Sequence, residues 1–123
     1  MLQKEVILSI GGHDYTITFP TVGQFYSIEA MKQRLSGGMY NTMVLSPADS
    51  AQHALDMIDI EATLVILCPK LIEDLKVKNF SELDIRDYTE IRDKYYEVVA
   101  PFFREVQSVL KGDEKEKVSD EKA

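Results

Sequence analysis

The chain has 123 residues, of which 45% are hydrophobic and 28% charged, a composition typical of soluble globular proteins and too apolar for disorder throughout. Its 14 Lys and Arg against 21 Asp and Glu leave a formal net charge of −7, which disfavours nucleic acid and anionic lipid as partners. One cysteine and two histidines provide neither an internal disulfide nor the four ligands of a structural zinc site. The start lacks the pattern of a signal peptide, and the longest apolar run, residues 64–68, is too short to cross a bilayer.

An N-terminal β-hairpin is predicted for residues 5–19. Residues 5–10 are mainly apolar, and residues 15–19 alternate large apolar side chains with threonine, the pattern of a half-buried strand. Gly11 and Gly12 lie between the two segments and can adopt positive φ at low steric cost. Because an isolated hairpin is only marginally stable in water, we expect this one to pack on the rest of the chain or on a partner.

A helix is predicted from about Val22 to Leu35. Thr21 and Gln24 have the spacing of a capping box at its start. Apolar residues recur on one side of this segment, and two glycines follow it as a stop signal. The next stretch, residues 39–45, is apolar without a clean period, and we interpret it as a loop or a short extended segment.

A second helix is predicted over about residues 47–68. Ser46 is a typical N-cap residue, and the proline after it suits the first helical position. Pro69 disfavours helical geometry at the residue before it and so marks the end. Residues 64–67 are apolar all round and should form the most deeply buried helical segment. A short amphipathic helix is expected over residues 71–75.

The last helical region is predicted over residues 82–111, with Ser81 as its N-cap. Its apolar positions advance in steps of three and four, the cleanest helical period in the chain. These positions are Tyr88, Ile91, Tyr95, Val98, Phe102, Val106 and Val109 or Leu110. Pro101 lies within the stripe and should kink the helix or split it in two.

Residues 112–123 form a charged tail with five acids, three lysines and Val118 as the only sizeable apolar residue. Such a segment buries too little to offset its ordering entropy, so we expect it to be mobile when the protein is alone. The predicted domain therefore spans residues 1–111. Its fold class is α+β and mainly helical, with the hairpin packed on a bundle of three to four helices.

The acidic residues of the second helix are candidates for metal binding or acid–base chemistry. Asp49, His53 and Asp56 share roughly one helical face, which would allow a divalent metal, although a solvated polar face has the same spacing. Nothing near Asp56, Asp59 and Glu61 marks a pocket that would separate their pKa values. We interpret these three as a solvent-facing acidic strip.

The remaining reactive side chains do not form a catalytic pattern. His13 lies in the predicted turn, where exposure is the default, and Cys68 adjoins the apolar run and is interpreted as a small buried core residue. The glycine pairs do not match phosphate- or dinucleotide-binding fingerprints. We therefore expect no enzyme activity, no cofactor and no metal site.

Apolar residues without an evident place in the core are more informative about function. Residues 39–45 either fold back on the core or form an adaptable surface, and Met suits the second role. The adjacent aromatics Tyr95–Tyr96 and Phe102–Phe103 point to different sides of one helix, so one of each pair needs a partner beyond the core. We assign a protein-binding surface to Met39, Tyr40, Met43, Tyr96 and Phe103.

Over roughly residues 5–111 the chain resembles the small tail assembly chaperones of long-tailed bacteriophages. The resemblance lies in the pattern strand, glycine turn and strand leading to F-P-T-V-G-Q, followed by the helix starts S-P-A-D and F-S-E-L-D. It implies a non-enzymatic protein of the host cytoplasm that coats an aggregation-prone tape-measure protein while the tail tube polymerises. It also implies self-association into a homo-oligomer, and in that family a longer frameshifted product often extends the same domain.

A second hypothesis is a structural virion or adaptor protein (a head, connector or tail component) that stays in the mature particle. In that case the hairpin edge would add to the sheet of a neighbouring subunit, and the charged tail would order against another subunit. The expected partner is thus either a tape-measure-like client or a neighbouring virion subunit, with no nucleic acid and no membrane.

Overall fold

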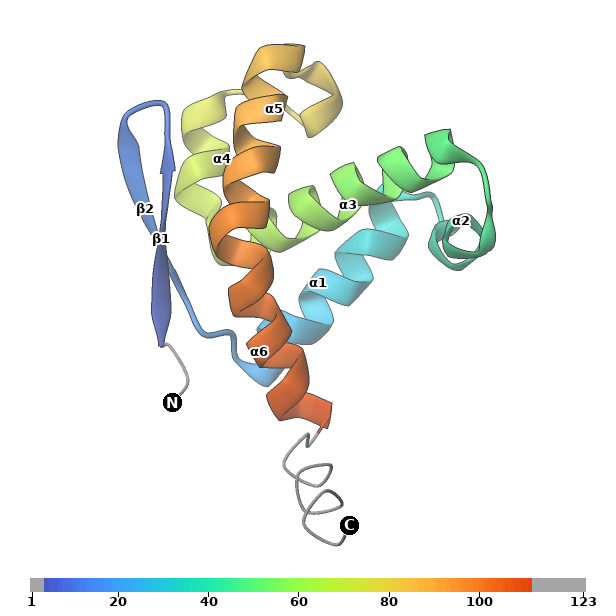
Figure 1. Cartoon of the computed structure of the whole chain (residues 1–123), viewed down its shortest axis with the longest axis horizontal. Coiled ribbons are helices and arrows are strands. Elements are labelled where there is room, and N and C mark those ends of the chain that lie inside the picture. The colour runs from blue at the N-terminus through green and yellow to red at the C-terminus, as the bar shows by residue number, and fades with distance from the viewer. Residues whose placement is uncertain (1–3, 112–123) are drawn as a thin grey trace, which may run out of the picture.

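A computed structural model of the chain describes residues 4–111 (Figure 1). Two strands come first, β1 (Glu5–Ile10) and β2 (His13–Thr18). The helical elements that follow are α1 (Val22–Leu35), α2 (Tyr40–Leu45), α3 (Asp49–Leu67), α4 (Pro69–Leu75), the 3₁₀ turn η1 (Phe80–Glu82), α5 (Ile85–Lys94), the π-helical turn η2 (Tyr95–Val99) and α6 (Ala100–Lys111). The predicted α+β, mainly helical fold is confirmed, whereas the predicted mobile tail lies outside the described residues.

The two strands form an antiparallel hairpin in which Glu5 pairs with Thr18 and Ile10 with His13. Gly11 and Gly12 have φ of 58° and 83°, the left-handed geometry that tight hairpin turns require. One face of the hairpin is buried, and its side chains are Val6, Leu8, Ile10, Tyr15 and Ile17. In Figure 1 the hairpin stands along one side of the helices, and β1 contacts η2 and α5.

The helices cross over the second half of α3. α1 packs along α3, and α5, η2 and α6 form one long helical rod that passes over both in Figure 1. On the rod side the Tyr95 hydroxyl donates to Thr63 Oγ1 at 3.3 Å. Residues 60–64 are therefore fully buried, while Val65 and Ile66 are half-buried. The prediction that residues 64–67 are the deepest segment is wrong, because the crossing helices cover α3 one turn earlier.

The long rod is interrupted immediately before Pro101. Proline has no N–H to donate, so the usual bond to Glu97 cannot form. Instead the Ala100 N–H donates to the carbonyl of Tyr95, five residues back, which inserts one extra residue into the turn. The predicted break is thus a π turn, and Val99, rather than Val98, is fully buried.

The π turn also decides where the paired phenylalanines lie. Phe102 and Phe103 are both buried, because Phe19 packs edge-on against Phe102 at 5.5 Å and Phe25 stacks on Phe103 at 5.9 Å between ring centroids. Phe103 is only 7% exposed. Its assignment to a protein-binding surface is therefore wrong, since α1 supplies the partner that it needs.

Residues 39–45, expected to be a loop, contain the short helix α2. The Ser46 N–H donates to the carbonyl of Met43 at the end of this helix, and the Ser46 hydroxyl accepts the Ala48 N–H at 3.2 Å. Ser46 thus belongs to the connection between α2 and α3. Contrary to expectation it does not cap α3, which begins two residues later than predicted, after Ala48.

The start of the last helical region also differs from the prediction. Ser81 lies inside η1, where its N–H donates to the side chain of Asn79 at 3.0 Å. The N-cap of α5 is Asp84, whose carboxylate accepts the Arg86 N–H at 2.7 Å. The sequence F-S-E-L-D therefore contains two successive caps.

Replacing Phe102 by Ala should lower the free energy of unfolding by about 3–5 kcal/mol, because it empties a fully buried site beside Phe19. The measurement is denaturant unfolding followed by circular dichroism. Val109, on the same helix but exposed, is the control, and Val109→Ala should change the value by less than about 0.5 kcal/mol. Equal effects of the two changes would contradict this packing.

Candidate functional site: the α2 arm

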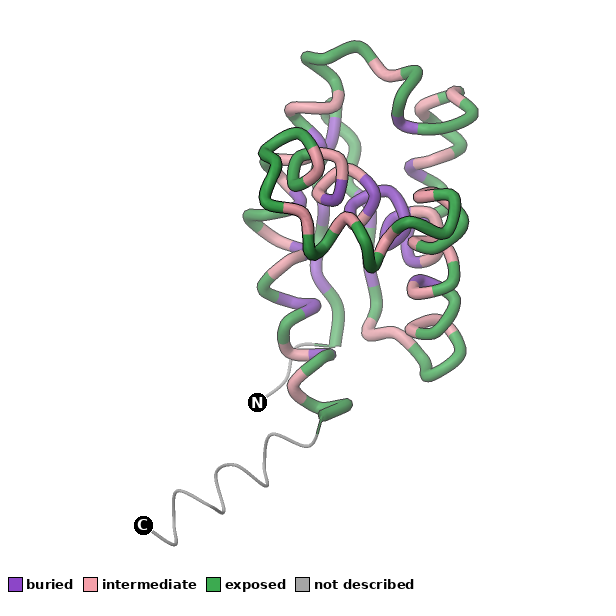
Figure 2. The backbone as a smooth tube through the Cα atoms, turned by 90° about the vertical axis from the view of Figure 1, so that its right-hand side faces the viewer, coloured by how far each residue is buried: buried purple, intermediate pink, exposed green. Residues whose placement is uncertain are grey.

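The α2 arm, residues 39–45, presents apolar side chains to solvent. Met39 and Val44 are each 50% exposed and Leu45 is 84% exposed, while Tyr40 and Met43 are half-buried. The arm lies at the end of the molecule farthest from the hairpin (Figure 1), and that end faces the viewer in Figure 2. Such clustering is characteristic of interaction surfaces.

Polar contacts hold the arm in place. The Tyr40 hydroxyl donates to Asp59 Oδ1 at 2.6 Å, which ties α2 to α3. Lys32 Nζ lies 3.1 Å from Glu29 Oε2, 3.7 Å from Asp59 Oδ1 and 5.6 Å from the centroid of the Tyr40 ring. The lysine side chain is only 12% exposed, so its charge is paired near the tyrosine ring. The arm is thus fixed through Tyr40 while its apolar side chains stay outside.

Burial changes the acid–base properties of this anchor. Burial, followed by the hydrogen bond to Asp59, raises the pKa of the Tyr40 phenol. Burial also raises the pKa of Asp59, although the Tyr40 hydroxyl and Lys32 act against this. Glu61 is only 6% exposed. The prediction of a solvent-facing acidic strip is therefore wrong for Glu61, which η1 covers, whereas the Asp59 side chain is 37% exposed and only partly covered.

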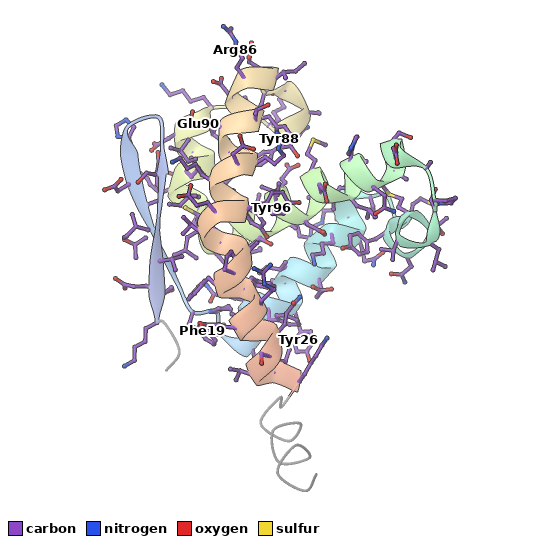
Figure 3. All side chains as sticks on the ribbon, in the orientation of Figure 1. Phe19, Tyr26, Arg86, Tyr88, Glu90 and Tyr96 are labelled. Carbon is purple, nitrogen blue, oxygen red and sulfur yellow. The ribbon has the colours of Figure 1, made fainter. Side chains whose placement is uncertain are left out.

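Tyr96 lies near the anchor of the arm, on the π turn. It is 45% exposed and lines a cavity of about 180 Å³ together with Lys32 and Asp59. Figure 3 labels it where the long rod passes α3. Burial raises the pKa of its phenol to about 12. Of the five residues assigned to a binding surface, the structure places Met39, Tyr40 and Met43 on one arm and Tyr96 beside its anchor.

A second exposed apolar surface was not predicted from the sequence. We name it the α1–α6 patch, and its exposed residues are Val22, Tyr26, Val109 and Leu110. Val22, Val109 and Leu110 line a cavity of about 120 Å³ between the start of α1 and the end of α6, at the end of the molecule where Figure 3 labels Phe19 and Tyr26. The spacing of Val22 and Tyr26, one helical turn apart, was the available signal.

The candidate metal ligands do not converge. Within residues 4–111 no group of three or more His, Cys, Asp or Glu side chains is placed to hold a metal ion, and Asp49, His53 and Asp56 are no exception. Cys68 is 3% exposed, which confirms its place in the core, and burial raises the pKa of its thiol. His13 is exposed at the start of β2. Among the described helices, none has the length and apolarity to span a membrane.

Comparisons with protein-family models, curated proteins and solved structures found no match. We therefore infer function from the exposed surfaces of the described residues.

Replacing Tyr40 by Phe should loosen the arm, because Asp59 loses its shortest hydrogen bond. We expect the amides of residues 40–45 to exchange with solvent faster, together with a loss of about 1 kcal/mol in the free energy of unfolding. Hydrogen exchange followed by NMR measures both effects. Tyr26→Phe, on an exposed ring of α1, is the matched control and should leave the arm unchanged. Unaltered exchange in Tyr40→Phe would show that this hydrogen bond does not hold the arm.

The protein should lose stability between pH 10 and 12. The hydrogen bond to Asp74 raises the pKa of Tyr15 to about 12, and burial raises that of Tyr95 to about 12. In the unfolded chain a tyrosine has a pKa of about 10. The folded state thus favours the neutral phenols, so their stabilisation is complete below pH 10 and is lost as the pH rises towards 12. Denaturant midpoints and absorbance of ionised tyrosine should change together, and midpoints constant to pH 12 would contradict this.

Proposed function

We propose that this protein is a non-catalytic phage tail assembly chaperone that binds and shields a tape-measure-like client during tail morphogenesis in the host cytoplasm. The observation that supports this best is the α2 arm, in which Met39, Val44 and Leu45 are exposed on a helix anchored through Tyr40. Exposed apolar side chains contribute little to the packing of a monomer, whereas they are suited to contact with a partner.

The chemistry of the arm suits a helical client. Methionine is unbranched and polarizable, so it can follow the uneven apolar face of an amphipathic helix. The net charge of −7 keeps the protein and its complexes apart in solution. The apolar arm can cover the apolar face of an aggregation-prone polypeptide, and the acidic surface of the protein keeps the resulting complexes dispersed.

The α1–α6 patch supports self-association as part of the same proposal. It lies apart from the α2 arm, at the end of the molecule where the chain leaves α6 (Figure 1). One surface can therefore bind a second copy while the other binds the client. In this arrangement a homo-oligomer would line up several α2 arms along an extended helix.

A structural virion or adaptor protein is the alternative, and the hairpin favours it. Among the described residues the sheet has two strands, so each strand has a hydrogen-bonded neighbour on one side only. The exposed face of β2 carries Asp14, Thr16 and Thr18, and the strand has no lysine or proline that would discourage pairing. A strand of a neighbouring subunit could extend this sheet.

Replacing Met39, Val44 and Leu45 together by Ser should abolish client binding and leave the far-ultraviolet circular dichroism unchanged, because all three side chains are at least half exposed. The chaperone proposal expects a very long, helix-rich reading frame directly downstream. The test is whether co-expression with each variant keeps the product of that frame soluble. The comparison variant changes Val22, Val109 and Leu110 of the α1–α6 patch to Ser, and it should lose self-association while each chain still binds the client through its α2 arm.

Purified particles separate the two functions. A chaperone should be absent from mature particles and should co-purify with the client before assembly. Stoichiometric presence in mature particles, measured by quantitative mass spectrometry, would refute the chaperone proposal and favour the adaptor.

A further inference from the structure

A cavity of about 330 Å³ lies between the end of α1, the middle of α3 and η1. Its size falls within the range of ligand pockets, roughly 300–1,000 Å³. Leu35, Met57 and Ile58 supply apolar wall, and Glu61 supplies a carboxylate. The lining therefore combines hydrocarbon with the buried carboxylate of Glu61, and the exposed Arg34 stands at its edge.

Glu61 is unusual because its charge is buried without a cationic partner. The side chain is 6% exposed, and its Oε2 accepts the Phe80 N–H at 3.2 Å. This bond joins η1 to α3 and gives one of the two carboxylate oxygens a hydrogen-bond partner. Among residues 4–111 no Lys, Arg or His forms an ion pair with this carboxylate. Burial raises the pKa of Glu61, and the hydrogen bond from the Phe80 N–H acts against this.

Arg34 is the cationic residue that lines this cavity, and it does not neutralise Glu61. Its Nη1 lies 3.8 Å from Met31 Sδ, so the guanidinium turns back along α1. Arg34 is exposed. The charged group that faces the interior of the cavity is therefore the Glu61 carboxylate.

The lining selects among ligand classes. A divalent metal needs several oxygen ligands, and one carboxylate is too few. An anion would be repelled by Glu61, and a purely apolar group would leave the carboxylate desolvated and unpaired. A lysine or arginine side chain satisfies both parts of the cavity, because its methylenes can pack on Leu35, Met57 and Ile58 while its charged end pairs with Glu61.

We propose that the Glu61 cavity receives a lysine or arginine side chain of the polypeptide that this protein binds, an inference that rests on the proposed client binding. The net charge of −7 attracts basic segments at long range, so the body of the protein and the cavity favour the same class of partner. The client segment would then be amphipathic and basic, with its apolar face on the α2 arm and a cation in this cavity.

The first test uses n-butylammonium chloride as a mimic of the lysine side chain, at low salt, with NMR of the backbone amides. We expect saturable shifts at Asn79, Phe80 and Ser81, next to the carboxylate. The uncharged n-butanol should not reproduce them. Glu61→Gln keeps an oxygen acceptor for the Phe80 N–H and should weaken binding by about tenfold or more, because only the charge is lost.

Arg34→Ala is the matched control, because it removes a like charge beside the cavity and keeps Glu61. It should bind n-butylammonium at least as tightly as the unmodified chain. Equal shifts with n-butanol, no saturable shift with n-butylammonium, or unchanged affinity in Glu61→Gln would each overturn the cavity as a cation receptor.

Co-expression then separates this inference from the proposed function. Glu61→Gln should reduce the amount of client kept soluble, whereas Arg34→Ala should not. If the client stays equally soluble with Glu61→Gln, the cavity inference fails while the chaperone function stands. If the client aggregates with the unmodified chain, the chaperone function itself fails.

Discussion

The missing N–H of Pro101 is the constraint on which the described fold depends. It forces a π turn at Tyr95–Val99, and the extra residue rotates the rest of the rod relative to its first half. Tyr95 then reaches Thr63 on α3, and β1 packs on the same turn. After the turn, Phe102 and Phe103 are both directed into the core. The hairpin and α3 thus contact the rod at the π turn, and α1 contacts it just after the turn, where Phe25 stacks on Phe103.

A core closed in this way leaves the α2 arm outside it. α3 is covered most deeply at residues 60–64, so its first half has room on its surface for a short helix held through Tyr40 and Asp59. The anchor is polar and partly buried, and the groups that it displays are apolar. Polar groups are thus partly buried and apolar groups exposed, the reverse of the usual arrangement. This makes the arm the strongest basis for a proposed binding function.

The candidate site was predictable only in part. Its residue types were visible in the sequence, because Met39 and Met43 lie between two helix boundaries and fit no core stripe. Tyr96 followed from the adjacent tyrosines, of which only one can face the core. Phe103 was misassigned by the same reasoning, because the sequence did not show that Phe25 of α1 covers it. The α1–α6 patch and the buried Glu61 were missed, because exposure depends on which elements cover a residue.

The sequence by itself determined the local elements. The alternation of β2, the Gly11–Gly12 turn and the Thr21 capping box depend on contacts within a few residues, and each forms as predicted. Tertiary structure alone decided the depth of each residue, the burial of Val99 and Phe103 and the partners of Asp59 and Glu61. These depend on residues distant in sequence: Tyr40 lies 19 positions from Asp59, as does Phe80 from Glu61. Local periodicity carries no information about such contacts, because it describes a helix and not what crosses it.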